Sequence, residues 1–318
     1  MSVFRWTIGV LILTSLLACR KEELALMWDQ QLSNTDELLT SVFFLDPQHG
    51  FAVGGKTWTL GVSLSTADGG ITWQADSLTN KLLYGLYFDE GQRGYCSGID
   101  GYLFRKDEPS GNWNFFRFPE WQQMRDLSFR EDGRGVMVGG QAYANGVIVS
   151  IGPGMNLDTI HVYEHELNGV CFSDEQTVHA VGYGLVLRSD DAGLTWTPNP
   201  IDGDFFRSVH FPSASVGYAV GFNGTIIKTT DGGHRWERLR KGGGVFSAGE
   251  PFRSVFFVDE FRGYIVGDHG VFWKTIDGGD KWQVAGNLPE ADLYDVHVVG
   301  QEGWIVGEGG LIIRFFDP

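Results

Sequence analysis

Three arginines and two tyrosines fall at one equivalent position of a repeating unit, where their side chains could bind an anion. The residues at that position, in chain order, are Thr40, Tyr84, Arg125, Asn168, Arg207, Arg253 and Tyr294. Guanidinium groups gathered at one concave place suit a carboxylate, a phosphate or an acidic peptide. The alternative is a structural role, in which the arginines pair with Asp126, Asp204 and Asp295 to hold loops.

Two tryptophans also stand outside the repeating pattern, Trp58 and Trp121. Both are expected on loops at the same end of the strands as the arginines. An exposed tryptophan can anchor a protein partner or stack on a sugar. The alternative is that each ring packs on its own unit. Asp100, Asp268 and Glu308 are expected nearby, but a glycosidase needs two carboxylates at a set separation, which the sequence does not give.

Motifs for catalysis are missing from the sequence. It contains no Gly-x-Ser-x-Gly, P-loop, Cys-x-x-Cys or His-Glu-x-x-His pattern. His161 and His165 fall in an expected strand and loop, so their spacing does not make a metal site. His210 and His297 share a position in an inner strand and are expected to be satisfied core residues. The sequence therefore predicts no metal, no cofactor and no enzyme.

The elements that position these residues follow from a repeat of 39 to 46 residues. Its marker is the glycine that ends an Ala-Val-Gly-like run, found at Gly54, Gly98, Gly139, Gly182, Gly221, Gly267 and Gly307. Each unit carries four short runs of β-branched and aromatic residues between turns. In the fifth unit these runs are residues 208–211, 217–221, 225–229 and 236–239. Four-stranded units of this length are typical of propeller blades, so we predict an all-β, seven-bladed β-propeller.

The two ends of the chain indicate how the ring closes. The seventh unit stops after its third run, residues 311–316, and the N-terminal region has a spare run led by Trp28. We expect this spare run to pair with the last one, which would remove two exposed edges. The prediction is a single propeller over 27–318. Its blades cover about 38–80, 81–118, 119–165, 166–202, 203–241, 250–290, and 291–318 with 27–32.

Four turns between the third and fourth runs share a Ser/Thr-x-Asp-x-Gly-x-x-Trp pattern. They are Thr66–Trp73, Ser189–Trp196, Thr229–Trp236 and Thr275–Trp282. The Asp can accept backbone N–H groups, the Gly can take positive φ, and the Trp offers an apolar face to the gap between sheets. One carboxylate in each turn is too few for Ca²⁺, so these turns are predicted to be structural.

These turns resemble the Asp-boxes of sialidases and related propellers. The wider Val-Gly-x-x-Gly-x-x-x-Lys-Thr-x-Asp-Gly-Gly-x-x-Trp phrase is similar to the photosystem II assembly and stability factor family, over residues 38–316. That resemblance implies a seven-bladed propeller with an Arg-rich patch on one face, for which Arg125, Arg207 and Arg253 are the candidates. A sialidase would use an Arg triad and a Tyr such as Tyr294, but the Arg-Ile-Pro element of sialidases is absent.

The function predicted from these features is non-catalytic binding of a protein or peptide partner, acidic in character, in a scaffolding or assembly role. The candidate ligand-binding residues are Tyr84, Arg125, Arg207, Arg253, Tyr294, Trp58 and Trp121. The alternative is a carbohydrate-active surface protein, either a glycan binder or a sialidase-like glycosidase.

The N-terminal segment indicates where the protein is located. Residues 1–18 read as a signal peptide, because Arg5 precedes an apolar run of 13 residues that is too short to span a bilayer. The end of this segment, residues 16–19, resembles a bacterial lipobox, which implies lipidation of Cys19, with 19–26 as a tether. Residues 20–23 resemble a surface-export signal, or are a solvated linker. We expect an outer-membrane lipoprotein that faces the periplasm or the cell surface.

Charge and cysteine content complete the prediction. The net charge of −16 and pI near 4.8 repel phosphate backbones, so no nucleic acid is expected as a partner. Membrane contact is expected through the lipid only, and the protein is expected to be a monomer. Cys96 and Cys171 fall in units too far apart for a disulfide and are read as small core residues.

Overall fold

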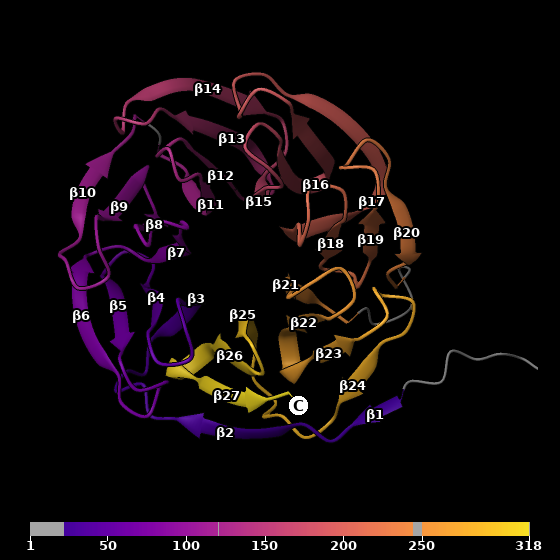
Figure 1. Ribbon diagram of the computed structural model, residues 1–318. Coiled ribbons are helices and arrows are strands. Elements are labelled where there is room, and N and C mark those ends of the chain that lie inside the picture. Colours follow the sequence, from indigo (N-terminus) through magenta and orange to yellow (C-terminus); the bar gives the residue numbers. More distant parts are fainter. Residues whose placement is uncertain (1–21, 120, 244–249, 318) are drawn as a thin grey trace, which may run out of the picture.

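The protein is a closed ring of β-strands, described here by a computed structural model over residues 22–119, 121–243 and 250–317. Figure 1 shows the ring from one end, with the first strand of each repeat unit near the centre and later strands toward the rim. Neighbouring strands are antiparallel except at β1 (Glu22–Leu24), which runs parallel to its partner. The predicted all-β propeller is therefore confirmed.

Three four-stranded sheets come from the first three repeat units. The first holds β3 (Leu38–Phe44), β4 (Gly50–Lys56), β5 (Leu60–Thr66) and β6 (Gln74–Thr79). The second holds β7 (Leu83–Phe88), β8 (Gly94–Gly98), β9 (Tyr102–Lys106) and β10 (Asn114–Arg117). The third holds β11 (Gln123–Phe129), β12 (Gly135–Gln141), β13 (Ala144–Ile151) and β14 (Leu157–Tyr163).

The predicted division into seven separate blades is wrong. Hydrogen bonding joins the described strands into six sheets, five with four or five strands and one with six. The six-stranded sheet holds β15 (Leu167–Phe172), β16 (Val178–Ser189), β17 (Thr197–His210), β18 (Gly217–Gly221), β19 (Ile226–Thr229) and β20 (Glu237–Arg240). The fourth and fifth repeat units share this sheet because strand hydrogen bonding continues through their connection. The first residues of β17 pair with β16, and its last residues pair with β18. Between these two paired stretches of β17, Phe205 lies opposite Tyr183 of β16.

The ring closes where both ends of the described chain meet. One sheet holds β25 (Leu293–Val299), β26 (Glu302–Gly307), β27 (Ile312–Phe316) and β2 (Met27–Gln31), and the other holds β21 (Phe252–Phe257), β22 (Gly263–Gly267), β23 (Phe272–Thr275), β24 (Gln283–Ala285) and β1. β2 lies antiparallel to β27 with Trp28 opposite Phe315, so the predicted pairing is confirmed. The parallel pairing of β1 with β24 adds a strand that we did not predict. Two short 3-10 segments, η1 (Asp268–Gly270) and η2 (Glu308–Gly310), join strands in these sheets.

Neighbouring sheets are held together by a repeated packing of aromatic rings. Phe257 stacks on Tyr218 of the preceding unit, with centroids 3.6 Å apart and planes at 4°, and meets Trp282 edge-on at 6.2 Å. The Phe257 ring also covers Gly263, where an added Cβ would lie 2.4 Å from it. The same packing recurs at Phe44 and Phe211. The tryptophans thus fill the gaps between sheets, as predicted.

The innermost strand of each unit has backbone N–H groups that face the axis and need an acceptor. Side chains of the neighbouring inner strand accept hydrogen bonds from these groups. The acceptor and donor residues are Asp126 with Val170, Ser128 with Phe172, Ser208 with Val255, His210 with Phe257, Asp295 with Val42, and His297 with Phe44. Burial lowers the pKa of His210 to about 4 and that of His297 to about 3. Both imidazoles therefore stay neutral. They are satisfied by hydrogen bonds as predicted, but they are half-buried and line the axial cavity instead of lying in the core.

The four Asp-box turns fold as predicted. In the third of them, Asp231 accepts the backbone N–H of Arg235 at 2.9 Å, and Thr229 accepts that of Gly233 at 2.9 Å. The φ angle of Gly233 is 83°, the left-handed region that favours glycine. Hydrogen bonds, first from the Arg235 N–H, hold the pKa of Asp231 below its ordinary value of 3.8. The repeated pattern of donors and acceptors closes each turn internally, in keeping with the predicted structural role of these turns.

The remaining predictions concern the cysteines and the N-terminal segment. Cys96 is buried, Cys171 is half-buried, and both are free thiols, as expected. The proposed signal peptide and lipidated Cys19 lie outside the described residues. Among the described residues there is no helix long and apolar enough to cross a membrane.

Adding one methyl group at Gly263 should destabilise the propeller. In Gly263→Ala the new Cβ would meet the Phe257 ring at 2.4 Å, and the ring cannot yield without leaving Tyr218. We expect the free energy of unfolding to fall by about 1–3 kcal/mol in chemical denaturation. Gly286→Ala is the matched control, since nothing lies within 4 Å of its added Cβ. Equal stability of the two variants would contradict this packing role.

Asp126 should make stability depend on pH. It lies against an axial cavity of about 270 Å³, and burial raises its pKa from 3.8 to about 7. Because the folded value is the higher one, its contribution is fully present below about pH 4 and is lost as pH rises through 7. Asp126→Ser should keep the hydrogen bond to Val170, as Ser208 does for Val255, and remove this dependence.

The measurement is chemical denaturation of both proteins at pH 5 and pH 8. Relative to the wild type, Asp126→Ser should gain unfolding free energy as the pH rises. A difference between the two proteins that is the same at both pH values would show that Asp126 does not titrate in this range.

Candidate functional site

The first strand of every repeat unit is interrupted at the same place by a β-bulge. In β11, Met124 lies opposite Gly139 and Asp126 lies opposite Val138, so Arg125 has no cross-strand partner. Equivalent register shifts occur in β3, β7, β15, β17, β21 and β25. In these strands the residues left without a cross-strand partner are, in the same order, Thr40, Tyr84 with Gly85, Asn168, Arg207, Arg253 and Tyr294. A bulge re-aims its extra side chain, and here it turns these residues toward the axis.

The marker glycines are required by these bulges. An added Cβ at Gly139 would lie 2.1 Å from the Gln123 carbonyl oxygen, and one at Gly267 would lie 1.9 Å from that of Pro251. Each glycine faces the strand segment that leads into a bulge, and a side chain there would push the two strands apart. From the sequence these glycines are predicted only to end strands, although their regular spacing also marks the positions of the bulges.

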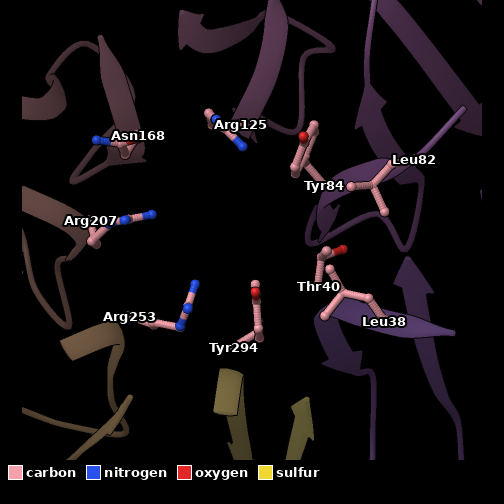
Figure 2. A pocket seen from close by; sticks show the side chains of 9 residues that line it. All are labelled: Leu38, Thr40, Leu82, Tyr84, Arg125, Asn168, Arg207, Arg253 and Tyr294. Atoms are coloured by element: carbon pink, nitrogen blue, oxygen red, sulfur yellow. The ribbon is translucent and has the colours of Figure 1, made fainter. Parts of the chain in front are cut away.

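The bulged residues line one cavity at the mouth of the ring. It measures about 300 Å³ and is lined by Leu38, Thr40, Leu82, Tyr84, Arg125, Asn168, Arg207, Arg253 and Tyr294. Figure 2 shows these side chains arranged around the opening, with the guanidinium groups of Arg207 and Arg253 directed into it. The structure therefore brings together the five predicted Arg and Tyr residues. Trp58 and Trp121 are not part of the lining.

Two of the three arginines have carboxylate partners, but these are not the aspartates that the structural alternative named. Arg125 Nε lies 2.9 Å from Glu166 Oε1, and Arg253 pairs with Asp268 and, at 3.1 Å, with Asp292. These carboxylates belong to loops at the mouth, within reach of the bulged side chains.

The alternative considered from the sequence, in which the arginines pair with Asp126, Asp204 and Asp295, is not what the structure shows, because those carboxylates accept hydrogen bonds elsewhere. Asp295 accepts from the hydroxyls of Ser41 and Ser254, and Asp204 accepts from the N–H groups of Asn223 and Thr225. Their oxygens are thus engaged along the inner strands and in a hairpin loop.

The tyrosines of the mouth each lie under an arginine. The Arg125 guanidinium is 4.8 Å from the Tyr84 ring centroid, and that of Arg253 is 4.0 Å from the Tyr294 ring. Burial raises the pKa of both tyrosine hydroxyls, so they remain neutral. Cation–π contact and ion pairing together fix Arg125 and Arg253 in place.

Arg207 differs from the other two arginines. Among the described residues no carboxylate lies within ion-pair distance of it, and its Nε has no hydrogen-bond partner. Burial, and then the charges of Arg253 and Arg125, lower its pKa. Its guanidinium lies over the rings of Phe205, at 4.5 Å, and Phe222, at 5.3 Å. Arg207 is therefore a half-buried cation whose charge an incoming anion would neutralise.

The two tryptophans lie at the same end of the strands as the mouth, Trp58 between β4 and β5 and Trp121 between β10 and β11. Trp58 is 59% exposed and Trp121 is 70% exposed. Lys81 lies 5.4 Å from the Trp58 ring, and Arg117 lies 4.5 Å from the Trp121 ring. A cationic side chain thus lies against one face of each indole ring, while most of the tryptophan side chain stays exposed to solvent.

The carboxylates near the mouth are unequal. Asp100 is ion-paired with Lys81 and Asp268 with Arg253, whereas Glu308 is exposed. In the parts of the chain that the structure covers, no three His, Cys, Asp or Glu residues are grouped closely enough to hold a metal ion.

Comparisons with known proteins agree with the propeller fold. Residues 246–317 match the family model described as "Photosynthesis system II assembly factor YCF48". A solved structure described as "YCF48 bound to D1 peptide" superposes with a TM-score of 0.71 and 16% identity, covering 94% of this chain and 98% of that one. YCF48 from Cyanidioschyzon merolae gives a TM-score of 0.68 and 19% identity, covering 91% and 98%.

The same architecture is found in an enzyme. The virginiamycin B lyase from Staphylococcus aureus superposes with a TM-score of 0.72 at 11% identity, covering 91% of this chain and 99% of that one. At these identities the likeness shows the fold alone. No curated protein matches the sequence. The chain is thus a β-propeller that resembles the photosystem II assembly factor in fold and, over residues 246–317, in sequence.

Proposed function

We propose that this protein is a non-catalytic, lipid-anchored propeller that binds an acidic peptide segment of a protein partner at its mouth. The observation that carries the proposal is Arg207, a half-buried guanidinium without a carboxylate partner among the described residues. Leaving a buried cation unpaired is unfavourable, so a ligand carboxylate would gain a charge-assisted contact there. The peptide held by the similar assembly-factor structure supports a peptide as the ligand.

The geometry favours binding over catalysis. Arg125 and Arg253 are already held by carboxylates and ring faces, so they can orient an anion without moving. Asp100 and Asp268 are engaged in ion pairs and are poorly suited to exchange protons with a substrate. We therefore assign the mouth to recognition, in a scaffolding or assembly role, and assign Trp58 and Trp121 to an extension of the same surface.

Replacing Arg207 should weaken the binding of a carboxylate. A dye-labelled peptide with one free carboxylate and no other charge can be titrated and followed by fluorescence anisotropy. Arg207→Ala should raise the Kd about 10- to 100-fold, because a hydrogen bond to a charged group contributes about 1.5–3 kcal/mol. The same peptide with its carboxylate amidated should bind weakly to both proteins.

Arg235→Ala is the matched control, since Arg235 is an exposed arginine of an Asp-box turn at the other end of the ring. Unchanged binding by Arg207→Ala, or an equal loss with Arg235→Ala, would refute the proposed role of the mouth. Binding of oligosaccharides that is lost in Trp58→Ser would instead favour the carbohydrate alternative.

The membrane anchor has a separate test. We propose that Cys19 carries the lipid and that the protein resides in the outer membrane, facing the periplasm or the cell surface. Cys19→Ser should move the protein from the membrane fraction to the soluble fraction in a bacterial host, with peptide binding unchanged. A variant that still pellets with membranes would exclude this anchor.

A further inference from the structure

An exposed group of aromatic side chains lies beside the unpaired arginine. We call Tyr143, Tyr183, Phe205 and Phe222 the aromatic shelf. The Tyr143 and Tyr183 rings lie 5.1 and 5.8 Å from the Phe205 ring, and the Arg207 guanidinium covers both Phe205 and Phe222. Phe205 is buried, but Tyr143 is 59%, Tyr183 48% and Phe222 38% exposed. Apolar surface is thus open to solvent next to the site proposed for the carboxylate.

The backbone of Tyr143 is held in an unfavourable conformation. Ala142 and Tyr143 form the two-residue turn between β12 and β13, with φ angles of 54° and 67°. Such a turn favours Asn-Gly, and a bulky side chain at positive φ costs roughly 1–2 kcal/mol. Strain of this kind persists where the surroundings enforce it and is frequent at binding sites.

Glu166 is the residue that enforces this conformation. Its Oε2 accepts the N–H of Tyr143 at 2.9 Å, while its Oε1 binds Arg125. Its backbone carbonyl accepts the N–H of Tyr183 at 3.1 Å. One buried residue therefore positions both exposed tyrosines and one of the mouth arginines, so the shelf and the cationic mouth form one unit.

We infer that the aromatic shelf binds an apolar side chain of the peptide, one or two residues from the carboxylate held by Arg207. This inference rests on the function proposed above. The occupant is an aliphatic or aromatic side chain, because the shelf is apolar, is continuous with the mouth and has a cation at its inner edge. One residue of an extended peptide spans at most about 3.5 Å, and the Arg207 guanidinium lies 4.5 Å from the Phe205 ring centroid. The apolar residue should therefore be one or two positions along the peptide from the residue that carries the carboxylate.

The test uses four peptides whose only charge is one carboxylate and which differ at two places. Each carries its carboxylate either as an internal Asp or as a free C-terminus, and the neighbouring residue is either Leu or Gly. The wild type should bind the Leu peptides about 3- to 10-fold more tightly than the Gly peptides, because the Leu side chain would bury part of its apolar surface against the rings. Comparison of the two carboxylate sources shows which one the mouth prefers.

Tyr143→Gly removes the ring and relieves the strained φ. It should abolish most of the preference for Leu and leave the affinity for the Gly peptides unchanged, with a melting temperature equal to or above that of the wild type. Phe261→Ser is the control, since Phe261 is 64% exposed but lies in the turn between β21 and β22 at the other end of the ring. It should keep the full preference.

The outcomes separate this inference from the proposed function. If the wild type binds Leu and Gly peptides equally, or if Tyr143→Gly weakens both alike, the shelf does not select the ligand and this inference fails alone. A lower melting temperature for Tyr143→Gly would show that the ring is structural, and would also overturn it. If none of the four peptides binds, the proposed function fails as well.

Discussion

The mouth of this propeller depends on a contact between a backbone carbonyl and a glycine without a side chain. At Gly139 the space of a Cβ is filled by the Gln123 carbonyl, and at Gly267 by that of Pro251. This close approach lets one residue of the inner strand bulge out while the next pairs normally. A slip of one residue in a strand turns every later side chain to the other face. The glycine therefore decides which residue of each unit faces the axis.

Gathering three guanidinium groups around one opening is electrostatically unfavourable, and the protein offsets this cost unequally. Arg125 and Arg253 each have buried or half-buried carboxylates and a tyrosine ring. Arg207 has only aromatic faces beside it, and its pKa is lowered by burial and then by the charges of Arg253 and Arg125. An anion that enters the mouth would neutralise this remaining charge. This energetic asymmetry among otherwise equivalent positions is the reason for proposing Arg207 as the place where a carboxylate binds.

The sequence predicted the lining of the mouth because equivalent positions in a repeat become equivalent positions in a ring. It also predicted the pairing of the Trp28 strand, since a missing fourth strand at one end needs a spare one at the other. The number of separate sheets was wrong because hydrogen bonding through β17 crosses a repeat boundary. Glu166 and Tyr143 were missed because they are brought to Arg125 and Arg207 by folding, and the Ala-Tyr turn carries no Asn-Gly signal.

The residues at the bulge position differ between units, and they divide into those that hold adjacent units together and those that give the mouth its direction. Thr40 donates its hydroxyl to the Leu83 carbonyl, and Asn168 donates its amide to that of Phe206, so both hold adjacent units together. Figure 2 shows Leu38, Thr40 and Leu82 on one side of the opening and Arg207 and Arg253 on the other. The mouth therefore has an apolar side and a cationic side. If the aromatic shelf holds an apolar side chain as proposed, a peptide bound by Arg207 would extend over the third to fifth units, which carry the shelf residues.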